Sequence, residues 1–219
     1  MDIDIFENGW DRNNAYIFGW IMSDGCLKLE GRNKTALAVR ISSNDLDIMQ
    51  WLHNKLCIGN KIYDQGKNGY QIKYRNKESI ELMILHGLTM RKSLTMEYPC
   101  IPEDVFSDFL RGYFDGDGSI VLRQTKYNLY GQVSFTCGSK QFLDGLQAQL
   151  FTFDITSHIY EDGRKTNKSY YLRVIKRSEI EKLYHLMYDN LECKGFLSRK
   201  YEKYSQLITS PPKYKSHVA

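Results

Sequence analysis

The spacing of hydrophobic residues changes along the chain in an order that occurs twice. In the first occurrence, YIFGWIMSDGCL (16–27) has helical spacing, LAVRISSNDLDIMQWLHNKLCIGNKIY (37–63) contains a strand, a helix and a strand, and YQIKYRNKESIELMILHGL (70–88) contains a strand and a helix. Alternation with a period of two residues is typical of half-buried strands, and apolar residues three and four apart are typical of amphipathic helices. This part of the chain therefore predicts the order αββαββα.

A second copy of the pattern follows 93–94 residues later. It consists of FLRGYFDGDGSI (109–120), GQVSFTCGSKQFLDGLQAQLFTFDITSHIY (131–160) and YYLRVIKRSEIEKLYHLMYDNL (171–191). Each copy closes with an Arg-Lys pair on a helical segment, in LTMRKSLTM (88–96) and in FLSRKYEKY (196–204). Because an internal repeat indicates a repeated structural unit, we expect an α+β protein of two pseudo-symmetric αββαββα halves, each with an antiparallel four-stranded sheet.

The composition between the copies suggests where the halves meet. EYPCIPED (97–104) holds two of the four prolines, and Pro102 is expected near the first turn of the second motif helix. The tail TSPPKYKSHVA is polar and interrupted by proline, as loose chain ends are. We therefore expect an N-terminal half (1–98), a linker (99–104), a C-terminal half (105–208) and a flexible tail (209–219).

The first helix of each copy carries small residues every four positions. These are Ala15, Gly19 and Ser23 in the first copy and Gly112 and Gly116 in the second. This spacing places them on one stripe of the helix, and a glycine inside a helix costs about 1 kcal/mol relative to alanine unless close packing offsets it. We expect the two helices to pack almost backbone to backbone, with the core of each half formed by the other faces, Ile17, Phe18, Trp20, Ile21, Phe109, Leu110, Tyr113 and Phe114.

Both helices are predicted to end in Asp-Gly, at Asp24-Gly25 and Asp117-Gly118. Glycine is a common helix stop because it accepts a positive φ. An aspartate is disfavoured there, because the carboxyl end of a helix carries partial negative charge, and a second carboxylate nearby adds repulsion. Two packed helices with this ending therefore predict a divalent-cation site.

Charge is distributed unevenly along the chain, although the formal net charge is only +4. Residues 26–80 hold ten Lys and Arg against five Asp and Glu, and residues 120–177 hold nine against four. Residues 1–25 and 81–119, which contain the motif helices, are acidic. The basic blocks contain the predicted strands, so the pattern favours two basic sheets that face a polyanion, with acids where a metal binds.

Several classes of protein do not fit the composition. The mean hydropathy is −0.49 and no apolar run reaches the roughly 18–20 residues of a membrane span. The N-terminal MDIDIFENGW is acidic, unlike a secretory signal, and the five cysteines contain no CxxC pair for a structural zinc site. We expect an intracellular protein with reduced thiols, cytoplasmic or organellar according to the genome that encodes it, and no membrane partner.

The segments IFGWIMSDG (17–25) and LRGYFDGDG (110–118) resemble the nine-residue motif of the LAGLIDADG homing-endonuclease family. Because the chain has two motifs with αββαββα units, it resembles the monomeric, two-motif branch. The resemblance implies a saddle-shaped monomer whose sheets lie in the major groove of double-stranded DNA. It also implies a Mg²⁺-dependent, staggered double-strand cut in a long, asymmetric target, in an enzyme that belongs to an intron.

The resemblance also implies roles for individual residues. Asp24 and Asp117 would be the catalytic, metal-binding acids, joined by the carbonyl oxygens of Ser23 and Gly116. Lys92 and Lys200 match the family's lysine near the attacking water. The cations expected to contact DNA are Lys28, Arg40, Lys61, Lys73, Arg75, Arg123, Arg173, Lys176 and Arg177.

Other functions remain open on the sequence alone. A LAGLIDADG protein can instead act as a maturase on intron RNA, although both acids that such proteins often lose are kept here. A non-cleaving DNA-binding regulator of the same fold is a further alternative, and metal-dependent cleavage discriminates it. The chain begins with Met and ends in HVA, so we do not expect an intein-embedded enzyme. The five histidines form no metal pair, and neither G-x-S-x-G nor a P-loop occurs, so another hydrolase class is disfavoured.

Overall fold

The computed structural model of the chain describes residues 9–33, 35–56, 59, 61–90, 92–126, 129–163 and 169–210, so most of the expected tail (209–219) lies outside it. The first half contains α1 (Arg12–Asp24), β1 (Cys26–Glu30), β2 (Ala36–Ser43), α2 (Leu46–Lys55), β3 (Tyr63–Asp64), the 3₁₀ turn η1 (Gly66–Asn68), β4 (Tyr70–Tyr74), α3 (Lys77–Leu85) and α4 (Lys92–Thr95). The second half contains α5 (Glu103–Asp117), β5 (Gly118–Gln124), β6 (Leu129–Cys137), α6 (Lys140–Thr152), β7 (His158–Glu161), β8 (Tyr170–Val174), α7 (Arg177–Tyr188) and α8 (Ser198–Thr209).

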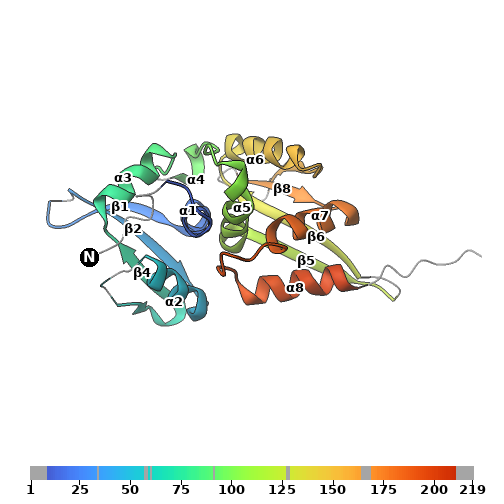
Figure 1. The fold of residues 1–219 in the computed structure, drawn as a ribbon, viewed down its shortest axis with the longest axis horizontal. Helices are drawn as coiled ribbons and strands as arrows, with labels where there is room; N and C mark the ends of the chain where they lie inside the picture. Colours follow the sequence, from blue (N-terminus) through green and yellow to red (C-terminus); the bar gives the residue numbers. More distant parts are fainter. Residues whose placement is uncertain are drawn as a thin grey trace, which may run out of the picture.

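The predicted α+β architecture of two similar halves is confirmed. The strands form two antiparallel four-stranded sheets, with the orders β1-β2-β4-β3 and β5-β6-β8-β7. Each half also has a helix after the αββαββα unit, α4 in the first half and α8 in the second, on the segments that carry the Arg-Lys pairs. Figure 1 shows α1 and α5 side by side in the middle of the molecule, with one sheet on either side of them.

Helices α1 and α5 contact each other through glycine, as the small-residue spacing predicts. A Cβ atom added to Gly19 would collide with the backbone oxygen of Phe109, and one added to Gly112 would collide with the backbone oxygen of Tyr16. Near the carboxyl ends, a Cβ on Gly116 would collide with the side chain of Ser23. The backbones of the two helices are therefore in direct contact at Gly19 and Gly112, and the side chain of Ser23 fills the space beside Gly116.

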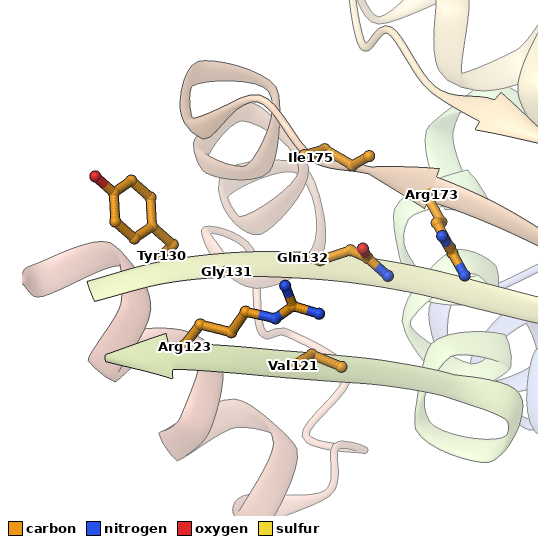
Figure 2. Close-up of a pocket in the computed structure, with 7 residues that line it drawn as sticks. All are labelled: Val121, Arg123, Tyr130, Gly131, Gln132, Arg173 and Ile175. Atoms are coloured by element: carbon orange, nitrogen blue, oxygen red, sulfur yellow. The ribbon is translucent and has the colours of Figure 1, made fainter. Parts of the chain in front are cut away.

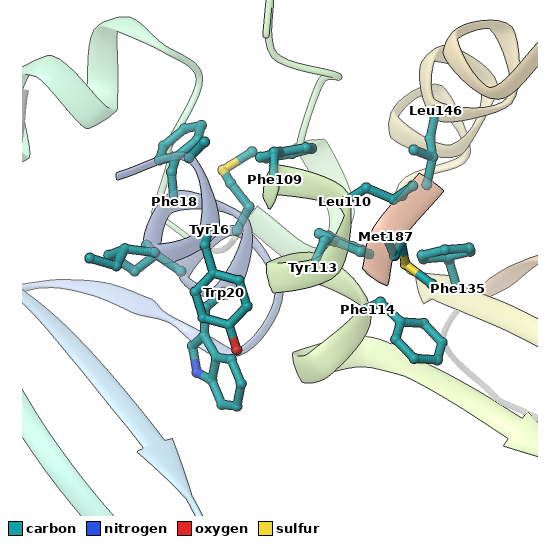
Figure 3. Packing of buried hydrophobic residues seen from close by; sticks show 14 of the residues in the cluster. Tyr16, Phe18, Trp20, Phe109, Leu110, Tyr113, Phe114, Phe135, Leu146 and Met187 are labelled. Atoms are coloured by element: carbon teal, nitrogen blue, oxygen red, sulfur yellow. The ribbon is translucent and has the colours of Figure 1, made fainter. Parts of the chain in front are cut away.

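The expected core residues of both motif helices are buried, with exposed fractions of 1% or less, and Figure 3 shows how they pack. In the second half, the rings of Tyr113 and Phe142 stack with centroids 4.6 Å apart, and Phe114 meets Phe135 edge to face at 5.6 Å. The ring centroids of Phe18 and Phe109 lie 6.1 Å apart across the α1–α5 contact. The two halves therefore share one continuous hydrophobic core. Among the described residues, no helix has the length and apolar character needed to cross a membrane.

Both motif helices end at the aspartates, as predicted, but the reason expected for the following glycines is wrong. Gly25 has φ −70° and Gly118 has φ −82°, so neither adopts a left-handed conformation. A Cβ on Gly25 would lie 2.8 Å from the Cα of Ile21, and one on Gly118 would lie 2.8 Å from the Cα of Phe114. The chain turns directly back over the last helical turn into β1 or β5, and only glycine leaves room for this path.

Candidate active site and nucleic-acid interface

Asp24 and Asp117 are the last residues of α1 and α5, so the paired helices bring their carboxylates to the same end of the helix pair. Asp24 is exposed and Asp117 is half-buried. The carboxyl carbon of Asp24 lies 3.4 Å from the position that a Cβ on Gly116 would occupy, next to the end of the opposite helix. Two acids that are 93 residues apart in sequence thus flank one short stretch of backbone.

A lysine from the closing helix of each half lies against each motif helix. Lys92 donates hydrogen bonds to the carbonyl oxygens of Met22, at 2.9 Å, and Ser23. Lys200, which is buried, donates to four carbonyl oxygens at the end of α5, those of Phe114, Asp115, Gly116 and Gly118, at 2.7–3.2 Å. Because these carbonyls carry the negative end of the helix dipole, each ammonium group caps one helix.

The electrostatics join these groups into one centre. Burial lowers the pKa of Lys92, and the charges of Asp117 and Asp24 oppose this shift. Burial also lowers the pKa of Lys200 to about 8, with Asp115 as the main opposing charge and smaller contributions from Asp24 and Asp117. Although its side chain reaches solvent, desolvation by the surrounding protein raises the pKa of Asp24, against the lowering effect of Lys200 and Lys92. Each acid therefore interacts with both lysines.

The residues of this centre fit a hard divalent cation. Mg²⁺ and Ca²⁺ prefer oxygen ligands, which the two carboxylates and the carbonyls of Ser23 and Gly116 offer. Both carbonyls already accept a hydrogen bond from a lysine, and each keeps a second lone pair. No cluster of three or more His, Cys, Asp or Glu side chains occurs among the described residues. A cation here would therefore complete its coordination with water and substrate oxygens, as Mg²⁺ usually does.

Asp115 is a buried carboxylate behind the centre that the sequence analysis did not identify. Its Oδ2 accepts hydrogen bonds from the hydroxyl of Tyr16 on α1 and from the backbone N–H of Leu197, which precedes α8, both at 2.9 Å. Its Oδ1 has no hydrogen-bond partner among the residues that the structure describes. Burial raises the pKa of Asp115 to about 6, and the nearby Lys200 opposes the shift. Asp115 thus connects both motif helices to the helix that carries Lys200.

A fully buried ion pair lies closer to the amino end of α5. Arg111 contacts Asp108 at 2.5 Å and also donates to the carbonyls of Gly195, Met187 and Cys193. Arg12 on α1 reaches the same aspartate at 3.2 Å. The sequence contained a signal for these residues, because positions 108, 111 and 115 are three and four residues apart and so share one face of a helix whose neighbours are apolar.

The predicted cations of the first half lie on or beside the solvent-facing side of the first sheet. Lys28 is exposed on β1, and Arg40 on β2 is paired in register with Lys73 on β4. Glu30 holds two of the arginines, because its oxygens lie 2.5 Å from Arg40 and 3.0 Å from Arg75. Outside this network, Lys61 is exposed and precedes β3.

The cations of the second half separate into two groups. Arg123 on β5 and Arg173 on β8 line a hollow of about 390 Å³ on the open face of the second sheet (Figure 2). Lys176 and Arg177 lie at the start of α7 instead, where Arg177 pairs with Glu181 at 2.6 Å and donates to the carbonyls of Ile208 and Ser210. Arg177 therefore holds the end of α8 and is directed away from the hollow.

Comparison with known families identifies both halves. The LAGLIDADG-like domain matches residues 104–187, and the WhiA LAGLIDADG-like domain matches residues 13–97. Each match contains one motif helix with its aspartate and the sheet that follows it. The internal repeat seen in the sequence is therefore a repeat of this domain.

The relatives found by sequence are much longer proteins, and each matches this chain over one segment. The chain is 28% identical over 208 residues to a probable translation initiation factor IF-2 of Methanocaldococcus jannaschii, a match that covers 86% of this chain and 16% of the relative. It is also 28% identical over 136 residues to the probable IF-2 of Thermococcus kodakarensis, which covers 58% of this chain and 11% of the relative. The chain thus spans less than a fifth of these relatives, and the similarity concerns one segment of each.

Solved structures with a similar fold include LAGLIDADG nucleases. The meganuclease I-AabMI bound to uncleaved DNA matches with a TM-score of 0.62 and 16% identity, over 89% of this chain and 88% of that one. The homing endonuclease I-GzeII in complex with its DNA target gives 0.62 and 12%, over 90% and 89%. I-DmoI in complex with DNA and Ca gives 0.54 and 19%, over 80% and 88%. This chain belongs to the LAGLIDADG family and carries both motif-bearing halves on one polypeptide.

Proposed function

We propose that this chain is a monomeric, site-specific homing endonuclease that makes a staggered, Mg²⁺-dependent double-strand cut in a long, asymmetric DNA target. The observation that carries the proposal is the convergence of Asp24, Asp117, Lys92 and Lys200 at the ends of the paired helices. Because the acids come from different halves, the centre lies between the two sheets, so a duplex that lies along both sheets would pass over it.

Within this proposal, the acids and the lysines of the centre have different roles in phosphodiester hydrolysis. Asp24 and Asp117, with the carbonyls of Ser23 and Gly116, would hold the metal. When bound, Mg²⁺ supplies charge compensation for the scissile phosphates and lowers the pKa of a bound water. Lys92 and Lys200 add positive charge beside the reacting oxygens and keep the helix ends in place.

Sheet cations would hold the duplex in register. Salt-dependent contacts to phosphates supply most of the affinity of such proteins, and side chains that reach base edges supply the specificity. The proposed set on or beside the sheets is Lys28, Arg40, Lys61, Lys73, Arg75, Arg123 and Arg173, with Lys176 at the start of α7. We omit Arg177 from this set because its guanidinium group already has partners on α7 and after α8.

Cleavage of a defined DNA tests the proposal. We would assemble the host gene without the inserted element, incubate the fragment with the chain and Mg²⁺, and map the ends on both strands. We expect a single staggered cut near the insertion point, with the loss of cutting but not of binding in Asp24→Asn and in Asp117→Asn. Asp144→Asn is the matched control, because it removes an exposed carboxylate that pairs with Lys140 on α6, away from the motif helices.

The possible outcomes separate the alternatives. Full cutting of both strands by either motif variant would contradict a shared two-carboxylate centre. Tight binding of DNA without cutting would favour the non-cleaving regulator, and binding of the intron RNA would favour the maturase.

A further inference from the structure

The open faces of the two sheets differ in chemistry. On the first sheet, Arg40 and Arg75 are held by Glu30, and lysines provide the remaining positive charge of the described strands. On the second sheet, the hollow is lined by two arginines together with apolar and amide side chains. Its lining consists of Val121, Arg123, Tyr130, Gly131, Gln132, Arg173 and Ile175.

Apolar side chains in this hollow are exposed without a structural reason. Val121 on β5 is 42% exposed and Ile175, which follows β8, is 50% exposed, although neither packs into the core. Between them on β6 lies Gln132, which pairs in register with Val121 (Figure 2). Strands β5, β6 and β8 are neighbours in the sheet, so the three side chains form a row of about 10 Å across it. That length corresponds to about three base-pair steps of DNA.

Arg173 is fixed beside this row by aromatic rings. Its guanidinium carbon lies 4.9 Å from the ring centroid of Tyr160 on β7 and 5.0 Å from that of Tyr171 on β8. Its Nε is buried and has no hydrogen-bond partner among the described residues. Stacking restricts the planar group while its donors stay unsatisfied, so less conformational freedom is lost when a ligand with two acceptors binds.

Each member of the surface matches one feature of the major groove. Arginine is the common bidentate partner of guanine O6 and N7, glutamine of adenine N6 and N7, and apolar side chains contact the methyl group of thymine. An A·T pair presents the adenine edge and the thymine methyl together, which suits a glutamine between two aliphatic side chains. Arg123 lies beside the row, two residues after Val121 on β5. It makes no hydrogen bond or ion pair with the described residues and suits a phosphate or a second guanine.

We propose that the second sheet is a base-reading surface for a window of about three base pairs, in which Arg173 recognises a guanine and Val121, Gln132 and Ile175 recognise adjacent A·T pairs through their thymine methyl groups. The inference rests on the proposed function and assigns specificity within it. The first sheet, where Glu30 already holds the two arginines and lysines supply the remaining positive charge, contributes mainly sequence-independent attraction to phosphates.

The test begins with a randomised duplex library and the full-length chain in the presence of Ca²⁺. The bound duplexes are sequenced, and in the best of them each thymine is replaced by deoxyuridine, which removes only the methyl group, and each guanine by 7-deazaguanine, which removes N7. We expect a loss of about fourfold in affinity per methyl, confined to one window of one half-site. We expect a loss of about tenfold for one guanine in the same window.

Protein variants test whether the named side chains cause the effects of the modified bases in the window. In the double variant Val121→Ser/Ile175→Ser, which removes the methyl groups of both side chains, deoxyuridine in the window should cost less than twofold. In Arg173→Met, which keeps the apolar stem and removes the donors, the deaza substitution should cost less than twofold. Leu85→Ser is the matched control, since it removes an exposed aliphatic side chain at the end of α3 that does not line the hollow, and it should keep both effects. Thermal unfolding checks that each variant is folded, and the exposed sites Val121 and Ile175 keep the test valid if Arg173→Met is unstable.

Three results would overturn the inference in distinguishable ways. Equal methyl effects in both half-sites, or effects that persist in the double variant, would refute the base-reading surface while DNA binding stands. A deaza effect that persists in folded Arg173→Met would refute the assignment of the guanine. Failure to enrich any duplex would refute both the inference and the proposed DNA-binding function.

Discussion

Replacement of Gly112 by alanine perturbs the helix contact on which the whole site depends. The added Cβ would collide with the backbone oxygen of Tyr16 and lie 3.0 Å from the backbone nitrogen of Trp20. Backbone atoms cannot rotate away as a side chain can, so the helices must separate by about 1 Å to restore ordinary contact distances. Overpacking of this kind costs about 1–3 kcal/mol.

Two effects of the Gly112→Ala substitution oppose each other. Alanine gains about 1 kcal/mol of helix propensity over glycine. Because the collision involves two helix backbones, we place the overpacking near the upper end of its range and expect a net loss of about 2 kcal/mol in the free energy of unfolding. For a chain of this length, that lowers Tm by about 4–8 °C.

The same substitution should impair cleavage more than it impairs folding. Asp24 and Asp117 are the last residues of α1 and α5, so a shift between these helices changes the distance between the acids. A displacement of about 1 Å in a catalytic centre can reduce the rate about 100-fold. We therefore expect the cleavage rate of Gly112→Ala to fall about 100-fold while the affinity for DNA changes little.

Urea unfolding monitored by circular dichroism measures the loss of stability, and single-turnover cleavage measures the loss of cleavage rate. Gly163→Ala is the control, because a Cβ at Gly163 meets no atom within 4 Å. If Gly112→Ala unfolds at the same urea concentration as the wild type and cuts DNA at the same rate, the close packing of α1 and α5 does not position the site.

Two further predictions concern the lysines. Burial holds the pKa of Lys200 at about 8, below its ordinary value. Between about pH 8 and 10.4 the unfolded chain therefore binds more protons than the folded chain. Because of this difference, the free energy of unfolding rises with pH in that window by about 3 kcal/mol. In Lys200→Met, the free energy of unfolding measured by urea titration should not show this rise between pH 7.5 and pH 10. If the variant shows a rise as large as that of the wild type, Lys200 is not its cause. On the first sheet, Lys28→Ala/Lys73→Ala should lower the slope of log affinity against log salt by about 1.8 if both contact phosphates, measured by fluorescence anisotropy, whereas an unchanged slope would exclude both from the interface.

Much of the fold could be predicted because the pattern is periodic and repeated. The two copies support each other, and the glycines at positions 19 and 112 indicate a close helix contact that would otherwise be unfavourable. The aspartates at the helix ends could be located for the same reason. Short strands such as Tyr63–Asp64 and the closing helix Lys92–Thr95 carry too few residues for periodicity to define them, so their bounds came only from the structure.

Individual side-chain hydrogen bonds over a long sequence separation could not be predicted. Nothing near Lys200 in the sequence indicates that its ammonium group binds carbonyls of residues 114–118, because that contact depends on how α8 packs against β5 and β6. The same holds for Asp115, whose partners Tyr16 and Leu197 are 99 and 82 residues away. The Gly25 and Gly118 interpretation failed for a related reason, since steric room and not φ selects glycine there.

The lysines change how the acidic centre is explained. From the sequence alone, two carboxylates at negative helix ends require a cation. In the structure, Lys92 and Lys200 already neutralise the carbonyls of both helix ends, and each interacts with both aspartates. The centre can therefore form without metal, which keeps the acids close together before DNA binds. A metal that binds afterwards meets preorganised oxygen ligands, and its affinity is then opposed by the positive charge of the two lysines. We therefore expect the scissile phosphates, which add negative charge, to strengthen metal binding, so that metal and DNA bind cooperatively.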